Sequence, residues 1–188
     1  MSRIAPVTGR RTPLLLRIIN AASRRFMGQQ PEPLQVVARS KRLLLPSLFV
    51  GQLVSVKTQL APETRLLAMH LVSELNGCTW CLDFGSYMSH RQGLEPDKLA
   101  SVLDYATSPL FTPAERVALE YAEVVTAPGA RVSDELFGRL RECYTEQEIV
   151  ELTVAIAAEN YFNRVNGALG IESQGFHSAL NVAPQAAT

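Results

Sequence analysis

Two cysteines separated by two residues are the part of this sequence best suited to chemistry. Cys78 and Cys81 follow an Asn-Gly dipeptide and open a stretch with helical periodicity. On the first turn of a helix, residues i and i+3 place their sulfurs on nearly the same face, within reach of a disulfide. Free N–H groups and the positive end of the helix dipole stabilise a thiolate there. A thiolate is the nucleophile toward peroxides and disulfides, so the spacing predicts a redox pair in which one sulfur resolves the other.

Two other uses of the cysteine pair remain open. A zinc site would need further ligands, and the candidates His70, His90, Cys143 and His177 show no recognised zinc spacing. Unpaired cysteines are also common as small core residues. Cys143 has no cysteine or histidine near it in sequence, so we expect it in the core or in an interface. The odd cysteine count suits a reducing compartment, and we expect a cytoplasmic protein.

The last long helical segment carries a second candidate site. One face of this segment begins apolar and ends polar, with Ile149, Leu152, Ile156, then Glu159 or Asn160, Asn163 and Asn166. A buried face that turns polar needs protein partners, water or a ligand. Arg164, near the polar end, could bind a carboxylate of a substrate. A hydrogen-bond network between helices or subunits is the alternative that we favour.

The elements that must position these residues are helices. Apolar residues recur three and four apart and no alternating strand pattern occurs, which predicts an all-α fold. The expected helices cover 12–28, 33–43, 46–58, 62–75, 78–92, 95–106, 113–127, 133–143 and 146–168. Capping boxes mark the helix starts at Thr112 and Thr145. Prolines are expected in first turns and glycines at left-handed C-caps, namely Pro46, Pro62, Pro96, Gly93 and Gly170.

Composition narrows the protein class. Of 188 residues, 47% are hydrophobic and 19% are charged, so the chain can build a sizeable core and is not disordered. Eighteen basic residues balance eighteen acidic ones, which argues against a dedicated nucleic-acid-binding protein. No apolar run reaches the roughly eighteen residues of a membrane span, so no span is expected.

The balanced charge hides an asymmetry. Residues 1–42 hold nine basic residues and one acidic residue, whereas residues 43–188 hold nine basic and seventeen acidic residues. The basic part could be a presequence or a surface-binding amphipathic helix, although it lacks the features of a secretory signal. We favour an arm that packs on the acidic remainder of its own or a neighbouring subunit. We therefore divide the chain into a basic N-terminal arm (1–34), a central domain (35–175) and a C-terminal tail (176–188).

Several separated segments resemble one known family. Residues 73–84 (SELNGCTWCLDF) are similar to the signature segment of the carboxymuconolactone decarboxylase and alkyl hydroperoxide reductase D (AhpD-like) superfamily. Residues 111–116 (FTPAER), 119–122 (LEYA), 149–153 (IVELT) and 160–166 (NYFNRVN) are similar to further family segments in the same order. The resemblance covers roughly residues 35–175, and agreement over several motifs makes it specific.

The resemblance implies an all-α AhpD-like fold and a homo-oligomer, commonly a trimer or hexamer. In the branch that carries the cysteine pair it implies peroxiredoxin-like reduction of hydroperoxides, with Cys81 attacking the peroxide and Cys78 resolving it. An external dithiol would then reduce the disulfide, with no cofactor and no metal. The decarboxylase branch lacks the pair, so Cys78 and Cys81 argue against lactone decarboxylation.

The sequence departs from the family pattern at both proton-handling positions. The family histidine, four residues after the second cysteine, is Gly85 here, and the family glutamate, twelve residues before the first, is Leu66. His70 shares a helix face with Leu66, one turn nearer the cysteines. As a hypothesis, His70 could accept the thiol proton, oriented by Glu63 or Glu74. The alternative is a partly buried histidine satisfied by a backbone carbonyl.

Three other residues near the pair invite an interpretation. His90 lies about two and a half turns beyond Cys81, on the order of 13 Å along the axis, and is a poor candidate base. Asp83 is interpreted as a partner of the helix N-terminal dipole. Trp80 could line a substrate pocket, or it could be a large core anchor.

The sequence therefore predicts a thiol-dependent peroxidase-like oxidoreductase. Two alternatives remain: a catalytically silent or redox-sensing helical oligomer, and a decarboxylase or isomerase that acts on a small acid near Asn163 and Arg164. Replacing both cysteines by serine distinguishes these functions, because only the decarboxylase or isomerase activity would survive it.

Overall fold

A computed structural model describes residues 2–9, 12–129 and 131–180 of the chain. Every regular element in these ranges is helical, in agreement with the predicted all-α class. The N-terminal helices are α1 (Leu14–Met27), α2 (Glu32–Val37) and α3 (Lys41–Ser55). The central helices are α4 (Pro62–Asn76), α5 (Thr79–Arg91), α6 (Pro96–Ala100) and the 3-10 turn η2 (Val102–Asp104). The remaining helices are α7 (Pro113–Thr126), α8 (Asp134–Cys143), α9 (Glu146–Leu169) and α10 (Phe176–Leu180).

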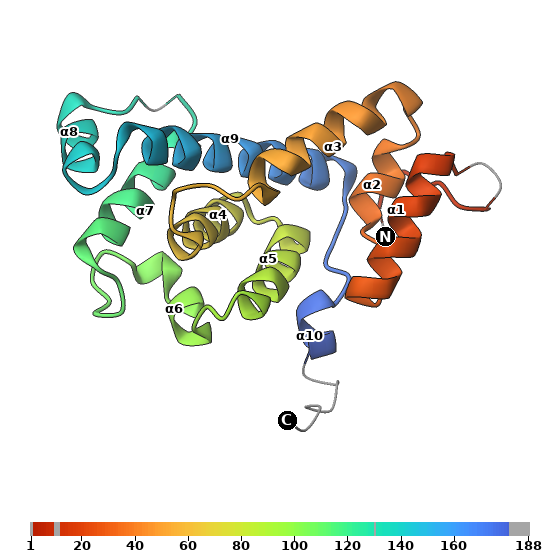
Figure 1. Ribbon diagram of the computed structural model, residues 1–188, viewed down its shortest axis with the longest axis horizontal. Coiled ribbons are helices and arrows are strands. Elements are labelled where there is room, and N and C mark those ends of the chain that lie inside the picture. Colours follow the sequence, from red (N-terminus) through yellow and green to blue (C-terminus); the bar gives the residue numbers. More distant parts are fainter. Residues whose placement is uncertain (1, 10–11, 130, 181–188) are drawn as a thin grey trace.

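Helix α4 lies at the centre of the molecule. It packs against α9, α7 and α5, and the long helix α9 runs from α8 past α7 and α4 to α3 (Figure 1). The core side chains on these helices are apolar and almost fully buried, among them Leu67, Leu71, Leu119, Leu152 and Ile156. Removing such side chains from water is the main driving force that holds the helices together.

Most helix boundaries follow from local residue chemistry. Thr112 and Thr145 both form complete capping boxes, with Glu115 and Glu148 respectively, as predicted. Pro62 and Pro96 occupy first helical turns, and Gly93 and Gly170 adopt left-handed backbone conformations, also as predicted.

Two helix predictions were wrong. Pro46 lies inside α3 rather than in a first turn, and the chain breaks earlier, at residues 38–40. The proline interrupts one backbone hydrogen bond without ending α3, because tertiary packing can override that local cost. The segment predicted as one helix at 95–106 divides into α6 and η2 at Ser101.

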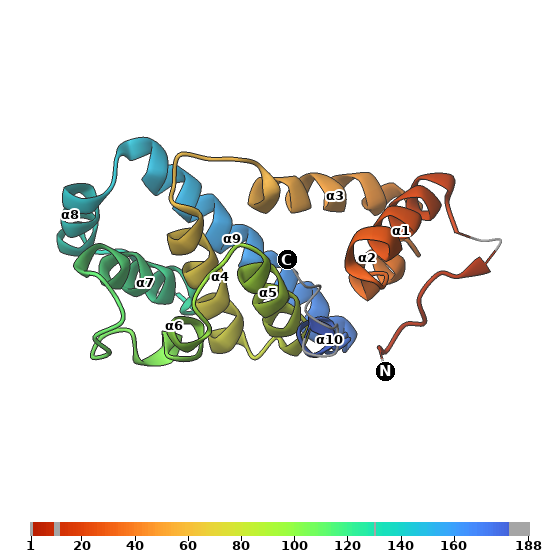
Figure 2. The ribbon, with the colours of Figure 1, turned by 60° about the horizontal axis from the view of Figure 1, so that its bottom comes forward.

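The N-terminal helices form one end of the molecule. Helices α1 and α2 lie at the end opposite α7 and α8, and α3 leads from them back along α9 (Figures 1 and 2). Arg3 anchors the first residues through hydrogen bonds to the carbonyls of Ala168 and Leu169.

Candidate active site

The cysteine pair lies where α4 turns into α5. Gly77 takes a left-handed conformation (φ 64°) at the end of α4, and Cys78 becomes the N-cap of α5. The Cys81 N–H donates to the Cys78 sulfur at 3.3 Å. The two sulfurs are bonded to each other, with a Cα–Cα distance of 5.3 Å, so the predicted disulfide reach is confirmed. Both side chains are buried, at 4% and 5% exposure.

A buried amide from the last long helix contacts both sulfurs. The Asn166 side-chain amide donates to Cys81 Sγ at 3.4 Å and lies 3.9 Å from Cys78 Sγ. Asn166 is only 1% exposed. The polar stripe on 146–168 pointed to this residue, but the sequence gave no reason to place it against the cysteines, which are more than eighty residues away.

The rest of the polar stripe forms a network between α9 and α4. Glu159 accepts hydrogen bonds from Ser73 Oγ and Asn163 Nδ2, both at 2.8 Å. Asn76 donates to Asn160 and Asn163 at 3.0 Å each. Burial raises the pKa of Glu159, although its two hydrogen-bond donors act in the opposite direction. Of the two interpretations of this stripe, the geometry agrees with the network between helices.

His70 is buried on α4 beside the redox helix. Burial lowers its pKa from 6.5 to about 4, so the imidazole is neutral at pH 7. Its Nε2 lies 3.7 Å from Glu74 Oε1. Its buried Nδ1 has no hydrogen-bond partner among the described residues, so the expected backbone carbonyl is not there. A Cβ placed on Gly85 would lie 3.7 Å from this Nδ1, which means that His70 borders the space a side chain at position 85 would enter.

The proposed role of Glu63 in orienting His70 was wrong. Its carboxylate binds Lys98 at 2.6 Å, and Lys98 also binds Glu115 at 2.6 Å. Leu66, at the position of the family glutamate, is buried among the core residues. Glu63 and His70 share a face of α4, but the carboxylate of Glu63 instead binds the cation Lys98 on α6.

Asp83 holds the C-terminal segment against α5. Its carboxylate accepts the Ser173 hydroxyl at 2.9 Å and the backbone N–H groups of Gln174, Phe176 and His177 at 2.9, 3.0 and 2.8 Å. Partial burial would raise the pKa of Asp83, but the four hydrogen bonds outweigh it and lower the pKa. The interpretation of Asp83 as a partner of its own helix dipole stays a prediction; it did not foresee these bonds, because the donors come from residues ninety positions later in the chain. We call residues 171–180 the C-terminal strap.

The C-terminal strap completes an aromatic cluster beside the cysteines. Trp80 is half-buried and stacks on Phe84 with ring centroids 4.9 Å apart. Phe176, only 1% exposed, packs edge-on against both rings. Trp80 Nε1 donates to Gln174 Oε1 at 2.8 Å, which ties the redox helix to the strap. Phe176 docks here because burying an aromatic ring removes apolar surface from water.

Three residues that the sequence made candidates for a functional or structural role lie on the surface. His90 is exposed at the far end of α5, as expected of a residue that takes no part in the site. Arg164 is also exposed, whereas its neighbour Asn163 is buried, so the two do not line one pocket. Cys143 is an exposed free thiol at the last residue of α8, so its predicted place in the core was wrong. A place in an interface stays a prediction.

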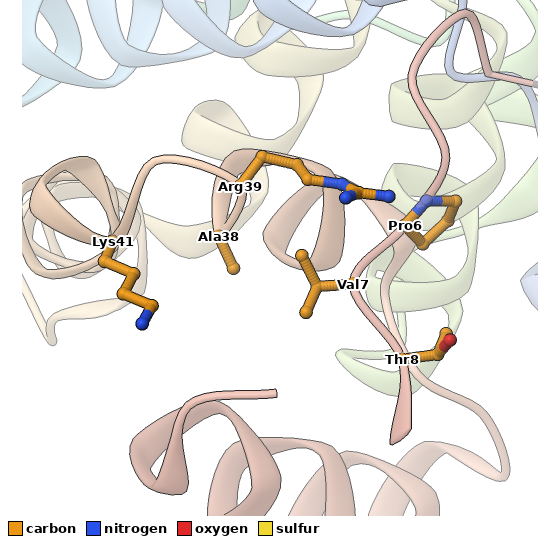
Figure 3. Close-up of a pocket in the computed structure, with 6 residues that line it drawn as sticks. All are labelled: Pro6, Val7, Thr8, Ala38, Arg39 and Lys41. Carbon is orange, nitrogen blue, oxygen red and sulfur yellow. The ribbon is translucent and has the colours of Figure 1, made fainter. Parts of the chain in front are cut away.

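Two surface hollows of the described chain lie away from the cysteines. A hollow of about 300 Å³ borders the N-terminal segment, where Arg39 extends toward Pro6 (Figure 3). A larger hollow beside α1 measures about 870 Å³, and no sequence-predicted site residue lines either one. Within the described part of the chain, no group of three or more His, Cys, Asp or Glu residues is placed to hold a metal ion. No helix there combines the length and apolarity of a membrane crossing.

Sequence comparisons place this chain in a family. Residues 47–124 match the model of the Carboxymuconolactone decarboxylase family. The chain is 35% identical over 164 residues to the uncharacterized protein YnjA of Escherichia coli (strain K12), covering 87% of this chain and 90% of YnjA. The chain belongs to the carboxymuconolactone decarboxylase family. The resemblance carried by residues 73–84 and by the later motifs is thereby confirmed.

Two solved structures share the fold of this chain. The alkylhydroperoxidase AhpD core protein of Ralstonia eutropha JMP134, an uncharacterized peroxidase-related protein, superposes with a TM-score of 0.83 at 18% identity, covering 93% of this chain and 94% of that protein. The debrominase Bmp8, in complex with 2,3,4-tribromopyrrole, superposes with a TM-score of 0.80 at 20% identity, covering 95% and 96%. At such identities the likeness shows the fold alone. The expected AhpD-like helical fold is confirmed.

Proposed function

We propose that this protein is a thiol-dependent peroxidase that uses the Cys78–Cys81 pair. The Cys81 thiolate attacks the peroxide O–O bond and becomes a sulfenic acid, and the hydroperoxide leaves as an alcohol after taking up a proton. The Cys78 thiol then attacks the Cys81 sulfur, which forms the disulfide and releases water. An external dithiol returns the pair to two thiols by disulfide exchange. The observation that carries this proposal is the bonded pair at the start of α5.

His70 is the proton acceptor in this proposal, and Glu74 orients it. The imidazole is neutral at pH 7 because its pKa is about 4, so a free nitrogen lone pair can accept a proton. Its Nδ1, which has no hydrogen-bond partner among the described residues, borders the position that a side chain at residue 85 would occupy. His70 on α4 thus lies next to Gly85 on α5, the position where the family pattern has a histidine.

A thiol count tests the proposed activity. The reduced protein is mixed with one equivalent of cumene hydroperoxide, and free thiols and intact mass are recorded. Oxidation of the pair removes two thiols and about 2 Da, whereas Cys78→Ser stops at the sulfenic acid with a gain of about 16 Da. Cys143→Ser, which removes the exposed bystander, should behave as the wild type. Retention of all three thiols would overturn the peroxidase proposal.

Redox sensing is a second candidate, favoured by the burial of both sulfurs. Exposures of 4% and 5% restrict access to the pair, which suits slow reversible oxidation better than rapid turnover. Under this candidate, the disulfide forms on incubation with peroxide, but the protein shows no sustained turnover with a dithiol donor. The third possibility, chemistry on a small acid at Asn163 and Arg164, finds no support, because the two side chains do not share a pocket.

The thiol count can also be made with a second class of substrate, namely halogenated aromatic compounds. Aromatic side chains flank Cys81, and the ring of Trp80 stacks on Phe84, so a planar aromatic substrate would find stacking partners there. Bmp8, a protein of the same fold, was crystallised with a brominated pyrrole. Reductive debromination would convert two thiols to a disulfide, replace bromine by hydrogen and release bromide. Bromide release together with loss of two thiols would move the proposal to this substrate class.

We also propose that the protein is a homo-oligomer in the cytoplasm. Helix α3 exposes one apolar stripe, with Leu45, Phe49 and Leu53 at 56%, 71% and 49% exposure. The basic residues 1–42 and the acidic remainder carry net charges of +8 and −8, so copies of the chain attract one another. A second copy is therefore the partner that fits this surface. The exposed free thiol of Cys143 favours a reducing compartment, where it would not form cross-links.

A further inference from the structure

The two sulfurs compete to be the nucleophile. Cys78 occupies the N-cap of α5, and its sulfur accepts the Cys81 N–H. The N-terminal end of a helix favours negative charge, so the position of α5 alone would make Cys78 the stabilised thiolate. The family order of events needs Cys81 instead. Something other than the helix terminus must therefore favour charge on Cys81.

Asn166 is placed to do this. Its Nδ2 lies closer to Cys81 Sγ, at 3.4 Å, than to Cys78 Sγ, at 3.9 Å. The amide is 1% exposed, and a hydrogen bond to a charged group in a water-poor environment is stronger than one at the surface. Among the described residues, the hydrogen bonds to the two sulfurs come only from Asn166 and the Cys81 backbone, so the donor set holds no cation.

The backbone around Asn166 is fixed. Gly170 ends α9 in a left-handed conformation, and the N–H groups of Gly170 and Ile171 both donate to the Asn166 carbonyl. This C-cap holds the last turn of α9 against the start of α5, which keeps the amide near the sulfurs.

The neighbouring ionisable groups do not replace the amide. In the resting protein His70 on α4 is neutral at pH 7, so it supplies no positive charge before it accepts a proton. Glu159 on α9 is buried with a raised pKa, and Glu74 on α4 and Asp83 on α5 are acids, so none of the three can stabilise a thiolate. On the three helices that surround the pair, the buried amide is the group suited to this task.

We propose that Asn166 is a catalytic residue: its side-chain amide donates to the Cys81 thiolate and makes Cys81, rather than the N-cap Cys78, the sulfur that attacks the oxidant. This assignment rests on the proposed redox function of the pair. The amide assists the step in which Cys81 loses its proton and attacks the O–O bond, and it leaves the later attack by the Cys78 thiol unchanged.

The test measures each thiol separately without any peroxide. In a Cys143→Ser background, Cys78→Ser leaves only Cys81, and Cys81→Ser leaves only Cys78. The rate of iodoacetamide alkylation against pH gives the thiol pKa in each protein. Asn166→Leu, which keeps the branched shape but removes the donor, should raise the pKa of Cys81 by about one unit and slow its alkylation at pH 7 about tenfold. Asn166→Asp should raise the pKa further, because it places a second negative charge beside the thiolate.

The matched control is Asn163→Leu. This change removes a buried amide one turn earlier on α9 that bonds Glu159 and Asn76 but no sulfur. It should cost comparable stability and leave the pKa of Cys81 unchanged. In the protein with both cysteines, Asn166→Leu should also shift the first alkylation from Cys81 toward Cys78, as read by peptide mass mapping.

The outcomes separate this inference from the proposed function. An unchanged pKa of Cys81 in folded Asn166→Leu, or an equal rise in Asn163→Leu, would overturn the role of Asn166. If Asn166→Leu fails to fold, Asn166→Ser provides a smaller change, and an unaltered alkylation order in that variant would also overturn it. A raised pKa in a protein that is inert to hydroperoxides would support Asn166 and reject the peroxidase proposal.

Discussion

At the scale of single residues, the environment of His70 decides its charge. The side chain is 8% exposed, and burial lowers its pKa from 6.5 to about 4. Above pH 6.5 the histidine is neutral in both the folded and unfolded states. Below pH 6.5 the unfolded chain binds a proton that the folded chain does not, so stability falls as the pH drops toward 4, by up to about 3 kcal/mol.

His70→Gln tests both the pH dependence and the proposed proton transfer. Glutamine keeps a polar side chain but does not titrate, so urea unfolding at pH 7 and pH 5 should show a smaller loss of stability than in the wild type. Oxidation by hydroperoxide should slow at least about tenfold, since general base catalysis commonly contributes that much or more. An unchanged oxidation rate would leave His70 a structural residue.

At the scale of elements, the contact between α5 and the C-terminal strap depends on one carboxylate. Asp83 accepts four hydrogen bonds from Ser173, Gln174, Phe176 and His177. Because its pKa is lower in the folded state, the stabilisation is present above its ordinary pKa and is lost as the pH falls through the folded value. The strap is thus expected to be tightly held at neutral pH.

Asp83→Asn should loosen the C-terminal strap. An amide offers one oxygen and places an NH2 group against backbone donors, so most of the four bonds are lost and stability falls by about 1–3 kcal/mol. Chymotrypsin should then cleave after Phe176, and the emission of Trp80, the single tryptophan, should shift as Phe176 leaves it. Ser173→Ala, which removes one of the four donors, is the matched control with a small effect. Equal protease resistance in wild type and Asp83→Asn would contradict this account.

At the scale of the whole molecule, the N-terminal helices leave apolar surface uncovered. In α1, the polar Asn20 and Ser23 are buried while Leu14 and Ile18 are 71% and 60% exposed. The exposed apolar stripe of α3 continues this pattern. A water-facing apolar helix face is costly, which favours its burial against a second copy of the chain.

Phe49→Glu tests the assembly. The charge lies at the middle of the α3 stripe, where burial against another copy would be penalised. Light scattering coupled to size-exclusion chromatography should show the wild type as an oligomer and the variant at a lower mass. Leu103→Glu, at a residue 57% exposed on η2, is the control and should leave the mass unchanged. A wild type with the mass of one chain would contradict the proposed assembly.

The sequence by itself determined the features that depend on near neighbours. Helix starts at Thr112 and Thr145, the first-turn prolines Pro62 and Pro96 and the closeness of the two cysteines all arise within a few residues, where geometry is fixed by local backbone chemistry. The family motifs added the fold, since they occur in order along the chain.

Only the tertiary structure decided which distant polar groups meet. Asn166 reaches the sulfurs, Asp83 binds the C-terminal strap and Glu63 turns to Lys98 rather than to His70. Periodicity tells which face of a helix a residue occupies but not which helix packs there. Buried polar groups take whatever donors or charges the packing brings within reach, because leaving them unpaired costs free energy.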